Sequence, residues 1–474
     1  MKRLTPFLIL LTQSKISMLG AAIVTSAIIG DLILIIGELF VFESNPYIGI
    51  VVYTVFPALA ALGLGLIPVG VFWKARSLGA RNLRDIPVAL KPRNFKHLAQ
   101  MVFGLTMANL VVFAVFGYRG FHFMESREFC GQLCHQPMHP EFEVYKRSPH
   151  SEISCVECHI GSGMSYFVKS KLDGTRQMMA MITGNYSRPI PTPLHNLRPA
   201  RDVCEVCHHP ESFHGNLIKV IQTFEPDEDN TRAYTILNLR VGGGGGERRT
   251  ARGIHWHVSD KRHIRYYATD ERREDIVRVE QVNEDGSTRV WTRPGAELPP
   301  EALNPEEMRE MDCVDCHNRP THVYLPPDKA LDDRLADGII DPSIPWIRSL
   351  SEELITRKYE STEEAKKQIA ELPTIYRERY PDHWIEQQSK LPAVVTELQD
   401  LHELYVHPEM NIQWNTYPSL IGHPTVATSA CFRCHDGLLR DESGTTITAE
   451  CEACHYVLAD KERDPMIMRM LEDR

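Results

Sequence analysis

The chain has 474 residues, with 52 Lys and Arg against 62 Asp and Glu, and a formal net charge of −10 at pH 7. This length is too great for one ordinary domain, and the acidic balance excludes nucleic acid as a natural partner, because nucleic-acid phosphates bind basic surfaces. The charge is divided unevenly: residues 1–118 hold 10 basic and 4 acidic residues, a balance of +6, which leaves −16 for the rest. An acidic remainder of this size suits docking to basic patches on another protein, or serves solubility alone.

Three long apolar runs lie in the first part of the chain, at roughly 16–42, 48–73 and 98–118. Each meets or exceeds the ~20 residues that a helix needs to cross a bilayer. We therefore predict three transmembrane helices in contact with lipid. The first run is too long for the apolar core of a signal peptide and lacks a small-residue cleavage site, so we expect a retained anchor.

The basic residues predict the orientation of these helices. The loop 74–96 carries seven Lys and Arg against Asp85 alone, whereas the ESNPY turn after the first run carries no basic residue. Loops rich in Lys and Arg stay on the cytoplasmic side. We therefore expect a bacterial cytoplasmic (inner) membrane protein with a cytoplasmic N-terminus and with residues from 119 onward on the periplasmic, extracytoplasmic side.

The cysteines predict covalently bound haem. All twelve occur in short pairs followed by histidine, and five pairs have the C-x-x-C-H spacing with which c-type haem is attached. Structural zinc also uses C-x-x-C pairs, but neither zinc nor disulfides would require a histidine after every pair. The five motifs are Cys155–Cys158–His159, Cys204–Cys207–His208, Cys313–Cys316–His317, Cys431–Cys434–His435 and Cys451–Cys454–His455.

The remaining pair, in EFCGQLCHQPMH, has one residue more than the standard motif, because three residues separate Cys130 from Cys134. Since five haem motifs leave no other cysteine, we interpret Cys130, Cys134 and His135 as a sixth attachment site with a one-residue bulge. The cofactor prediction is therefore six haem c groups, with the motif histidine as the first ligand of each iron.

Histidines outside the motifs are numerous enough to supply a second ligand to every iron. Fourteen of the 21 histidines lie beyond residue 118 and outside the motifs. Two histidine ligands leave no open position on iron, which suits electron transfer. Short spacing from a motif selects His195, His214, His322 and His423 as candidates, and His402 and His407 are candidates because they bracket the run ELYV. We expect His209, His255, His257, His263 and His383 to be surface or structural residues.

The exported part also contains regular structure between the motifs. Residues 232–293 have strand composition, including a hairpin with its turn at NEDGS, and residues 342–408 are expected to be helical. We predict a membrane α-helical anchor of three transmembrane helices plus a multihaem c-type cytochrome domain, mostly helix and loop with a small β insert. The expected segments are the anchor 1–118, a trihaem segment 119–220, a β-rich insert 221–310, and a C-terminal trihaem segment 311–474 with a helical insert.

The runs SPHSEISCVECHIG, RPIPTP and NLRPARDVCEVCH, together with the apolar N-terminal part, carry a family resemblance. The chain resembles the NapC/NirT family of membrane-anchored multihaem quinol dehydrogenases, and within it the larger three-helix inner-membrane cytochromes of metal-reducing bacteria. Smaller relatives have four haems and one helix, so this chain departs by two haems and two helices. The resemblance implies menaquinol oxidation at the outer membrane boundary and electron delivery to periplasmic cytochromes or other redox proteins.

The resemblance also bears on iron ligands. It implies that His150, in SPHSE, reaches a later haem. Relatives often ligate the first iron with a methionine two residues after the motif histidine, but here Met138 lies three residues after His135 and is followed by His139. Either residue, or neither, is the ligand.

Quinol oxidation requires proton acceptors, and two acidic residues lie in the first apolar run. Asp31 and Glu38 are seven residues apart and share nearly one helix face. Ionisable groups within a bilayer usually mark function, so we expect Glu38 to accept a quinol proton and Asp31 to act as a relay or to form a wall of the site. The alternative is a helix–helix hydrogen bond, or a Glu38 side chain that extends to the membrane surface.

Three hypotheses follow for the whole chain. The first is an electron conduit that oxidises menaquinol near the Cys130 haem and delivers electrons from the Cys431 and Cys451 haems. The second is a reductase of a small nitrogen compound at a haem without a second ligand. The third is an electron-transfer subunit of a larger respiratory complex, in which another subunit binds the quinol.

Overall fold

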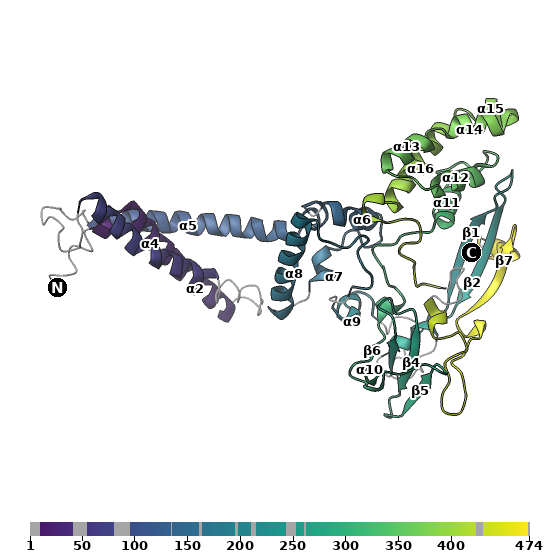
Figure 1. Ribbon diagram of the computed structural model, residues 1–474, viewed down its shortest axis with the longest axis horizontal. Helices are drawn as coiled ribbons and strands as arrows, with labels where there is room; N and C mark the ends of the chain where they lie inside the picture. Colours follow the sequence, from purple (N-terminus) through teal and green to yellow (C-terminus); the bar gives the residue numbers. More distant parts are fainter. Residues whose placement is uncertain are drawn as a thin grey trace. The chain divides into compact units, whose positions relative to one another are not determined.

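The computed structural model describes residues 10–40, 55–79, 95–133, 135–160, 164–194, 198–209, 215–242, 253–259, 262–422 and 430–472 (Figure 1). The chain forms two compact units. One contains Met1–Cys130 and His159–Met179, and the other contains Gly131–Cys158 and Ala180–Arg474.

The first unit is helical. Its long helices are α2 (Lys15–Phe40), α4 (Phe56–Ser77) and α5 (Phe95–Met124). Among the described residues, the stretches Lys15–Leu34 and Phe56–Ser77 are long and apolar enough to cross a membrane, whereas α5 provides a shorter apolar stretch, Gln100–Val112. Two of the three expected membrane helices are therefore candidate spans, and the third remains a prediction.

Helices α2 and α4 pack closely because small residues face each other. A Cβ atom added to Gly20 would lie 2.7 Å from the carbonyl oxygen of Gly63, and one added to Gly63 would lie 2.7 Å from that of Gly20. Ser17 Oγ donates a hydrogen bond to the Ile67 carbonyl at 2.9 Å. Small residues and hydroxyl hydrogen bonds of this kind are how helices associate in lipid, where the hydrophobic effect gives no attraction between them.

Helix α5 is joined to α2 by hydroxyl groups. The Thr25 and Thr106 hydroxyl oxygens are 2.6 Å apart, and Ser26 Oγ donates to the Thr106 carbonyl at 3.2 Å. Thr106 is buried. The three apolar runs of the sequence thus form one helical bundle within this unit.

The helical part of the second unit has its own hydrophobic core. Leu335, Leu350, Leu398 and many other apolar side chains there are almost completely buried. This confirms the helical interpretation of residues 342–408. The helices are α11 (Pro327–Ala336), α12 (Ile347–Thr356), α13 (Thr362–Ile369), α14 (Leu372–Arg379), α15 (Pro381–Gln387) and α16 (Leu391–Tyr405).

Two antiparallel sheets complete the second unit. One has the order β1-β2-β7, from Leu217–Phe224, Arg232–Leu239 and His455–Glu462. The other has the order β5-β4-β3-β6, from Thr288–Thr292, Ile276–Val282, His263–Ala268 and Arg309–Glu310. The hairpin predicted around NEDGS is confirmed, since β4 and β5 pair from Arg278–Thr292 to Val282–Thr288. The pairing of the late strand β7 with β2 was not foreseen.

Short elements connect these parts and carry most of the cysteine motifs. The helices are α6 (His135–Lys146), α7 (Cys155–His159), α8 (Met164–Thr183), α9 (Ala200–Cys204), α10 (Pro300–Leu303) and α17 (Met466–Glu472). The 3-10 turns are Ile254–Val258, Cys313–Asp315, Pro408–Met410, Ala430–Arg433 and Cys451–Ala453, and Phe129–Leu133 is a π-helical turn.

The close approach of α2 and α4 gives a stability prediction. Gly63→Leu should destabilise the helical unit by about 1–3 kcal/mol. The added Cβ would lie 2.7 Å from the Gly20 carbonyl oxygen, so the two helices would have to move apart. Gly65→Leu is the matched control, since a Cβ there meets nothing within 4 Å. Thermal unfolding of the detergent-solubilised protein should show a lower midpoint for Gly63→Leu only. Equal midpoints for the two variants would contradict this packing.

Candidate functional site

Each standard motif occupies a single helical turn. The backbone N–H of the motif histidine bonds to the carbonyl of the first cysteine in three of them, at 2.8 Å for His208, 2.8 Å for His317 and 3.0 Å for His435. Such a turn holds residues that are three and four positions apart on one side of the backbone. Both thiols and the imidazole can therefore face one porphyrin, which is the arrangement that attachment through two thioethers and one iron ligand requires.

The unusual first motif begins in a different kind of turn. Residues Phe129–Leu133, which include Cys130, are π-helical. A π-helix bonds residue i to residue i+5 rather than i+4, so it takes up one extra residue per turn. This is a physical account of the three-residue spacing after Cys130. Cys134 and the side chain of His135 lie outside the described residues.

Thiols of successive motifs are neighbours in the second unit. The Cys204 and Cys313 thiols are neighbours, and their interaction raises the pKa of Cys204 and lowers that of Cys313. The Cys158 thiol is also close enough to act on the pKa of Cys204. The second, third and fourth motifs therefore follow one another in space as they do in the sequence.

The series continues through the last two motifs. Burial, followed by the charge of the nearby Cys431 thiol, raises the pKa of Cys316 to about 12. Burial, followed by the same Cys431 thiol, raises the pKa of Cys454. A cysteine bound to haem through a thioether no longer titrates. What both pKa shifts show about the fold is that the Cys431 sulfur lies near those of Cys316 and Cys454.

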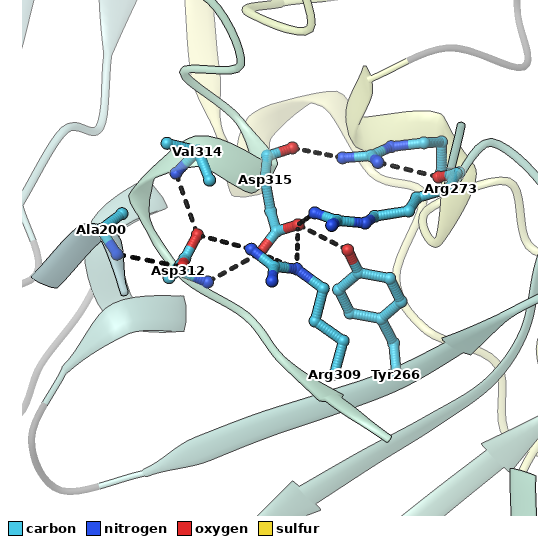
Figure 2. A network of polar contacts seen from close by, with 8 residues as sticks. Ala200, Tyr266, Arg273, Arg309, Asp312, Val314 and Asp315 are labelled. Atoms are coloured by element: carbon cyan, nitrogen blue, oxygen red, sulfur yellow. Dashed lines mark hydrogen bonds and ion pairs between the residues drawn. The ribbon is translucent and has the colours of Figure 1, made fainter. Parts of the chain in front are cut away.

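The fourth motif is fixed by a network of charges (Figure 2). Asp315, between the two cysteines of that motif, accepts hydrogen bonds from Arg309 Nε at 2.9 Å and from the Tyr266 hydroxyl at 2.5 Å. Burial opposes ionisation of Asp315, but the hydrogen bond from Arg309 lowers its pKa overall. Asp312 accepts a bond from the Ala200 N–H at the start of α9, at 3.4 Å. The fourth motif is thereby held to strand β3 and to the third motif.

The fifth motif is bonded to the fourth through Arg433. This residue lies between Cys431 and Cys434 in the sequence, and its side chain is buried. Arg433 Nη2 donates to the Asp315 carbonyl at 2.5 Å, and Nη1 donates to the Arg273 carbonyl at 2.9 Å. Arg273 itself lies 3.5 Å from the Asp315 carboxylate. The variable residues of two haem motifs thus bond to each other directly.

His150 lies opposite a motif histidine. Its ring centre is 6.0 Å from that of His208, with the rings inclined by 71°. A metal–imidazole bond of about 2.0 Å puts two rings on opposite sides of one metal about 6 Å apart between centres. The pair therefore fits the two axial positions of one iron. The family resemblance implies that His150 is a ligand of a later haem. In the structure, the His150 ring lies next to His208 of the third motif.

Two further motif histidines face His255 and His257, which the sequence predicts to be surface or structural residues. His255 and His317 have ring centres 6.4 Å apart and planes within 2° of parallel, and His257 and His435 have centres 5.8 Å apart at 78°. Both spacings again fit a shared iron. The expectation that His255 and His257 are merely surface or structural residues does not account for this placement. A possible signal in the sequence was the His-x-His spacing within IHWHV.

His322 is oriented by an acidic residue of α6. Its Nδ1 donates to the Glu141 carbonyl at 3.0 Å, while the Glu141 carboxylate binds Arg319 at 2.6 Å. Burial lowers the pKa of His322, which favours the neutral imidazole that a metal binds. A bond from Nδ1 to a carbonyl is typical of a ligating histidine, because it directs Nε2 toward the metal.

Three other candidates lie near one another. The ring centres of His139 and His407 are 5.9 Å apart, and their planes are inclined by 84°. Both are candidate second ligands, and neither belongs to a cysteine motif. His402 packs edge-on against Tyr359 at 5.3 Å in the helical core, and burial lowers its pKa to about 4. This position favours a structural role for His402.

The remaining candidates are placed only in part. Met138 is half-buried on α6. Asp31 is on α2, and its Oδ1 is buried with no hydrogen-bond partner among the described residues. Glu38 belongs to α2, but its side chain lies outside the described residues, as do His195, His214 and His423.

Comparison with known proteins agrees with these features. The sequence model for the N-terminal region of the NapC/NirT cytochrome c family matches residues 91–190, which include the first two motifs. The chain is 36% identical over 457 residues to the cytochrome c-type protein ImcH of Geobacter sulfurreducens, an alignment that covers 94% of this chain and 88% of that protein. No solved structure matches the chain. The family resemblance is confirmed, and the chain belongs to the NapC/NirT family of membrane-anchored c-type cytochromes, which hold haem covalently and transfer electrons.

Proposed function

We propose that this chain oxidises menaquinol at the outer face of the cytoplasmic membrane and passes the electrons through six haems c to periplasmic redox partners. The observation that carries the proposal is the spatial order of the attachment sites. Cys158 lies near Cys204, Cys204 lies near Cys313, and Cys431 lies near both Cys316 and Cys454, so neighbouring thiols link the second to the sixth motif in chain order. Electrons can thus move from each site to the next without leaving the chain.

The membrane part supports the point of entry. Residues 98–118 fall within α5, which bonds to α2 through Thr106, as a third spanning helix would. Together with the basic loop 74–96, this arrangement supports a cytoplasmic N-terminus and a periplasmic haem domain. The first motif then follows directly after the third helix, at the outer boundary where a quinol in the bilayer can approach.

Bound haem supplies one-electron transfer at an iron whose potential is set by its ligands. The chain would hold an iron with imidazoles, as at His150 and His208, whose ring centres are 6.0 Å apart, and carbonyl groups orient such rings, as the Thr448 carbonyl does for His435 at 2.6 Å. An iron held between two imidazoles would have no position for a substrate, so the ring pairs at the third, fourth and fifth motifs favour a conduit over reduction of a small nitrogen compound.

Oxidation of menaquinol to menaquinone releases two electrons and two protons, so the membrane part must accept protons. Asp31 and Glu38 are two helical turns apart on α2. We propose Glu38 as the first acceptor and Asp31 as a relay. The buried Asp31 oxygen without a hydrogen-bond partner among the described residues supports a functional role over a helix–helix hydrogen bond at that atom.

The number of haems is the first prediction. The purified chain should carry six haems, measured by the pyridine haemochrome assay and by intact mass. Cys130→Ala should lower the content by one or weaken attachment of one haem, because one thioether is lost from the first motif. Five haems in the unaltered chain would contradict the assignment of the Cys130–Cys134 pair.

The proton acceptors give the second prediction. In lipid-reconstituted protein mixed anaerobically with a menaquinol analogue, Glu38→Gln should slow haem reduction by about 100-fold, which is the scale of a lost proton acceptor. Asp31→Asn should slow it by about 10-fold as the relay is interrupted. The measurement is the rise of reduced c-haem absorbance with time.

Reduction of the same variants by dithionite must remain complete, because it needs no quinol site. Glu450→Gln, at an exposed residue before the last motif, is the matched control and should reduce at the original rate. Unchanged rates in Glu38→Gln and Asp31→Asn would remove these residues from the proposal. Failure of the unaltered protein to react with quinol would favour delivery of electrons by another respiratory subunit.

A further inference from the structure

The turn Ile254–Val258 is bonded to the segment that follows β2 in the second unit. Ile254 N donates to the Arg240 carbonyl at 2.7 Å. Gly253 precedes it with φ 93°, and a Cβ there would clash with the same carbonyl. The guanidinium of Arg262 lies 5.0 Å over the Trp256 ring. The side chains on this turn are therefore presented in a fixed direction.

Both histidines of the turn are oriented through Nδ1. His255 Nδ1 donates to the Val241 carbonyl at 2.7 Å, and His257 Nδ1 donates to the Ile254 carbonyl at 2.8 Å. These bonds fix the tautomer that carries its lone pair on Nε2, which is how most ligating histidines are prepared. On the opposite side, His435 has the same arrangement through the Thr448 carbonyl.

The two histidines face different motifs. His255 is opposite His317 of the fourth motif, and His257 is opposite His435 of the fifth, at the spacing that two imidazoles on one metal adopt. The fourth and fifth motifs are themselves held together by the bond from Arg433 to the Asp315 carbonyl. The four rings therefore form two pairs with fixed positions relative to each other.

We propose that the turn Ile254–Val258 supplies the second axial ligand to two irons at once: His255 Nε2 to the iron of the Cys313–Cys316 haem, and His257 Nε2 to the iron of the Cys431–Cys434 haem. The inference rests on the proposed attachment of haem at these motifs and adds the ligands that close two of the irons. One rigid turn then sets the separation of both haems, so that electrons cross between them over a constant gap.

The angles between the rings distinguish the two sites spectroscopically. In low-spin ferric haem, parallel axial imidazoles give a rhombic electron paramagnetic resonance signal, whereas perpendicular imidazoles give a strongly anisotropic signal with a larger maximum g value. The His255–His317 pair, at 2°, belongs to the first class and the His257–His435 pair, at 78°, to the second. Each histidine can therefore be tested through its own signal.

The experiment compares His255→Ala, His257→Ala and the double variant with His263→Ala, a control at an exposed histidine that bonds to Glu310. Each single variant should convert one haem to a high-spin form that binds carbon monoxide when reduced, and the double variant should convert two. His255→Ala should lose rhombic intensity and His257→Ala anisotropic intensity, and added imidazole should restore both. His263→Ala should match the unaltered protein.

Low-spin spectra and no carbon monoxide binding in both single variants would overturn the proposal. Because an alanine variant can fail to mature, His255→Met and His257→Met provide a second test. Methionine can still ligate iron and raises the haem potential, so each should show the near-infrared absorption of methionine-ligated ferric haem at one site. Absence of that band at full haem content would count against the assignment. The haem content of the unaltered chain is measured separately, so an error in the proposed function is recognised independently.

Discussion

In the proposed haem domain, one constraint governs the rest: an iron bound on both sides by imidazole would hold two rings about 6 Å apart. The chain meets this spacing with residues that are far apart in sequence. His150 meets His208, and His257 meets His435, which is 178 positions later. Bringing such distant residues together loses chain entropy, and metal–ligand bonds can offset that loss where apolar packing is sparse.

Protein–protein contacts reinforce the same arrangement. A large hydrophobic core of the second unit lies in the helical segment around α12 and α16, away from the motif turns in sequence. The fourth and fifth motif turns are also held by buried polar groups: Arg309 binds Asp315 (Figure 2), and Arg433 donates to the Asp315 carbonyl. Buried charges are stable only when paired, so each of these residues depends on the others. Neighbouring haem sites are consequently fixed to each other as well as to the fold.

Local chemistry explains what the sequence alone could predict. Haem attachment requires two thiols and an imidazole within one turn, so the five standard motifs can be recognised from the sequence alone. The hairpin of β4 and β5 is equally local, because its turn residues Asn283–Ser287 favour that reversal. The spacing after Cys130 predicts a one-residue bulge. The π-helical turn Phe129–Leu133 accommodates that extra residue, because a π-helix has one more residue per turn than an α-helix.

Second ligands and sheet order were less predictable, because they depend on how distant segments meet. His402 is a candidate because it flanks the run ELYV with His407, and in the structure it packs against Tyr359 in a helical core. His255 and His257 lack short spacing from a motif, and in the structure they face His317 and His435. Strand β7 begins at the histidine of the last motif, and nothing in its composition indicates that it pairs with β2, more than 200 residues earlier. Spacing along the chain does not report these long-range contacts.

The most direct test of the central claim uses sealed vesicles that contain the unaltered protein with its haem domain outward. Menaquinol is supplied in the bilayer, and c-haem reduction and external pH are followed together under anaerobic conditions. A self-contained quinol-oxidising conduit should show reduction of all six haems, with one proton released to the outer solution for each electron transferred. Oxidised haems that dithionite reduces but menaquinol does not, with no external acidification, would contradict it.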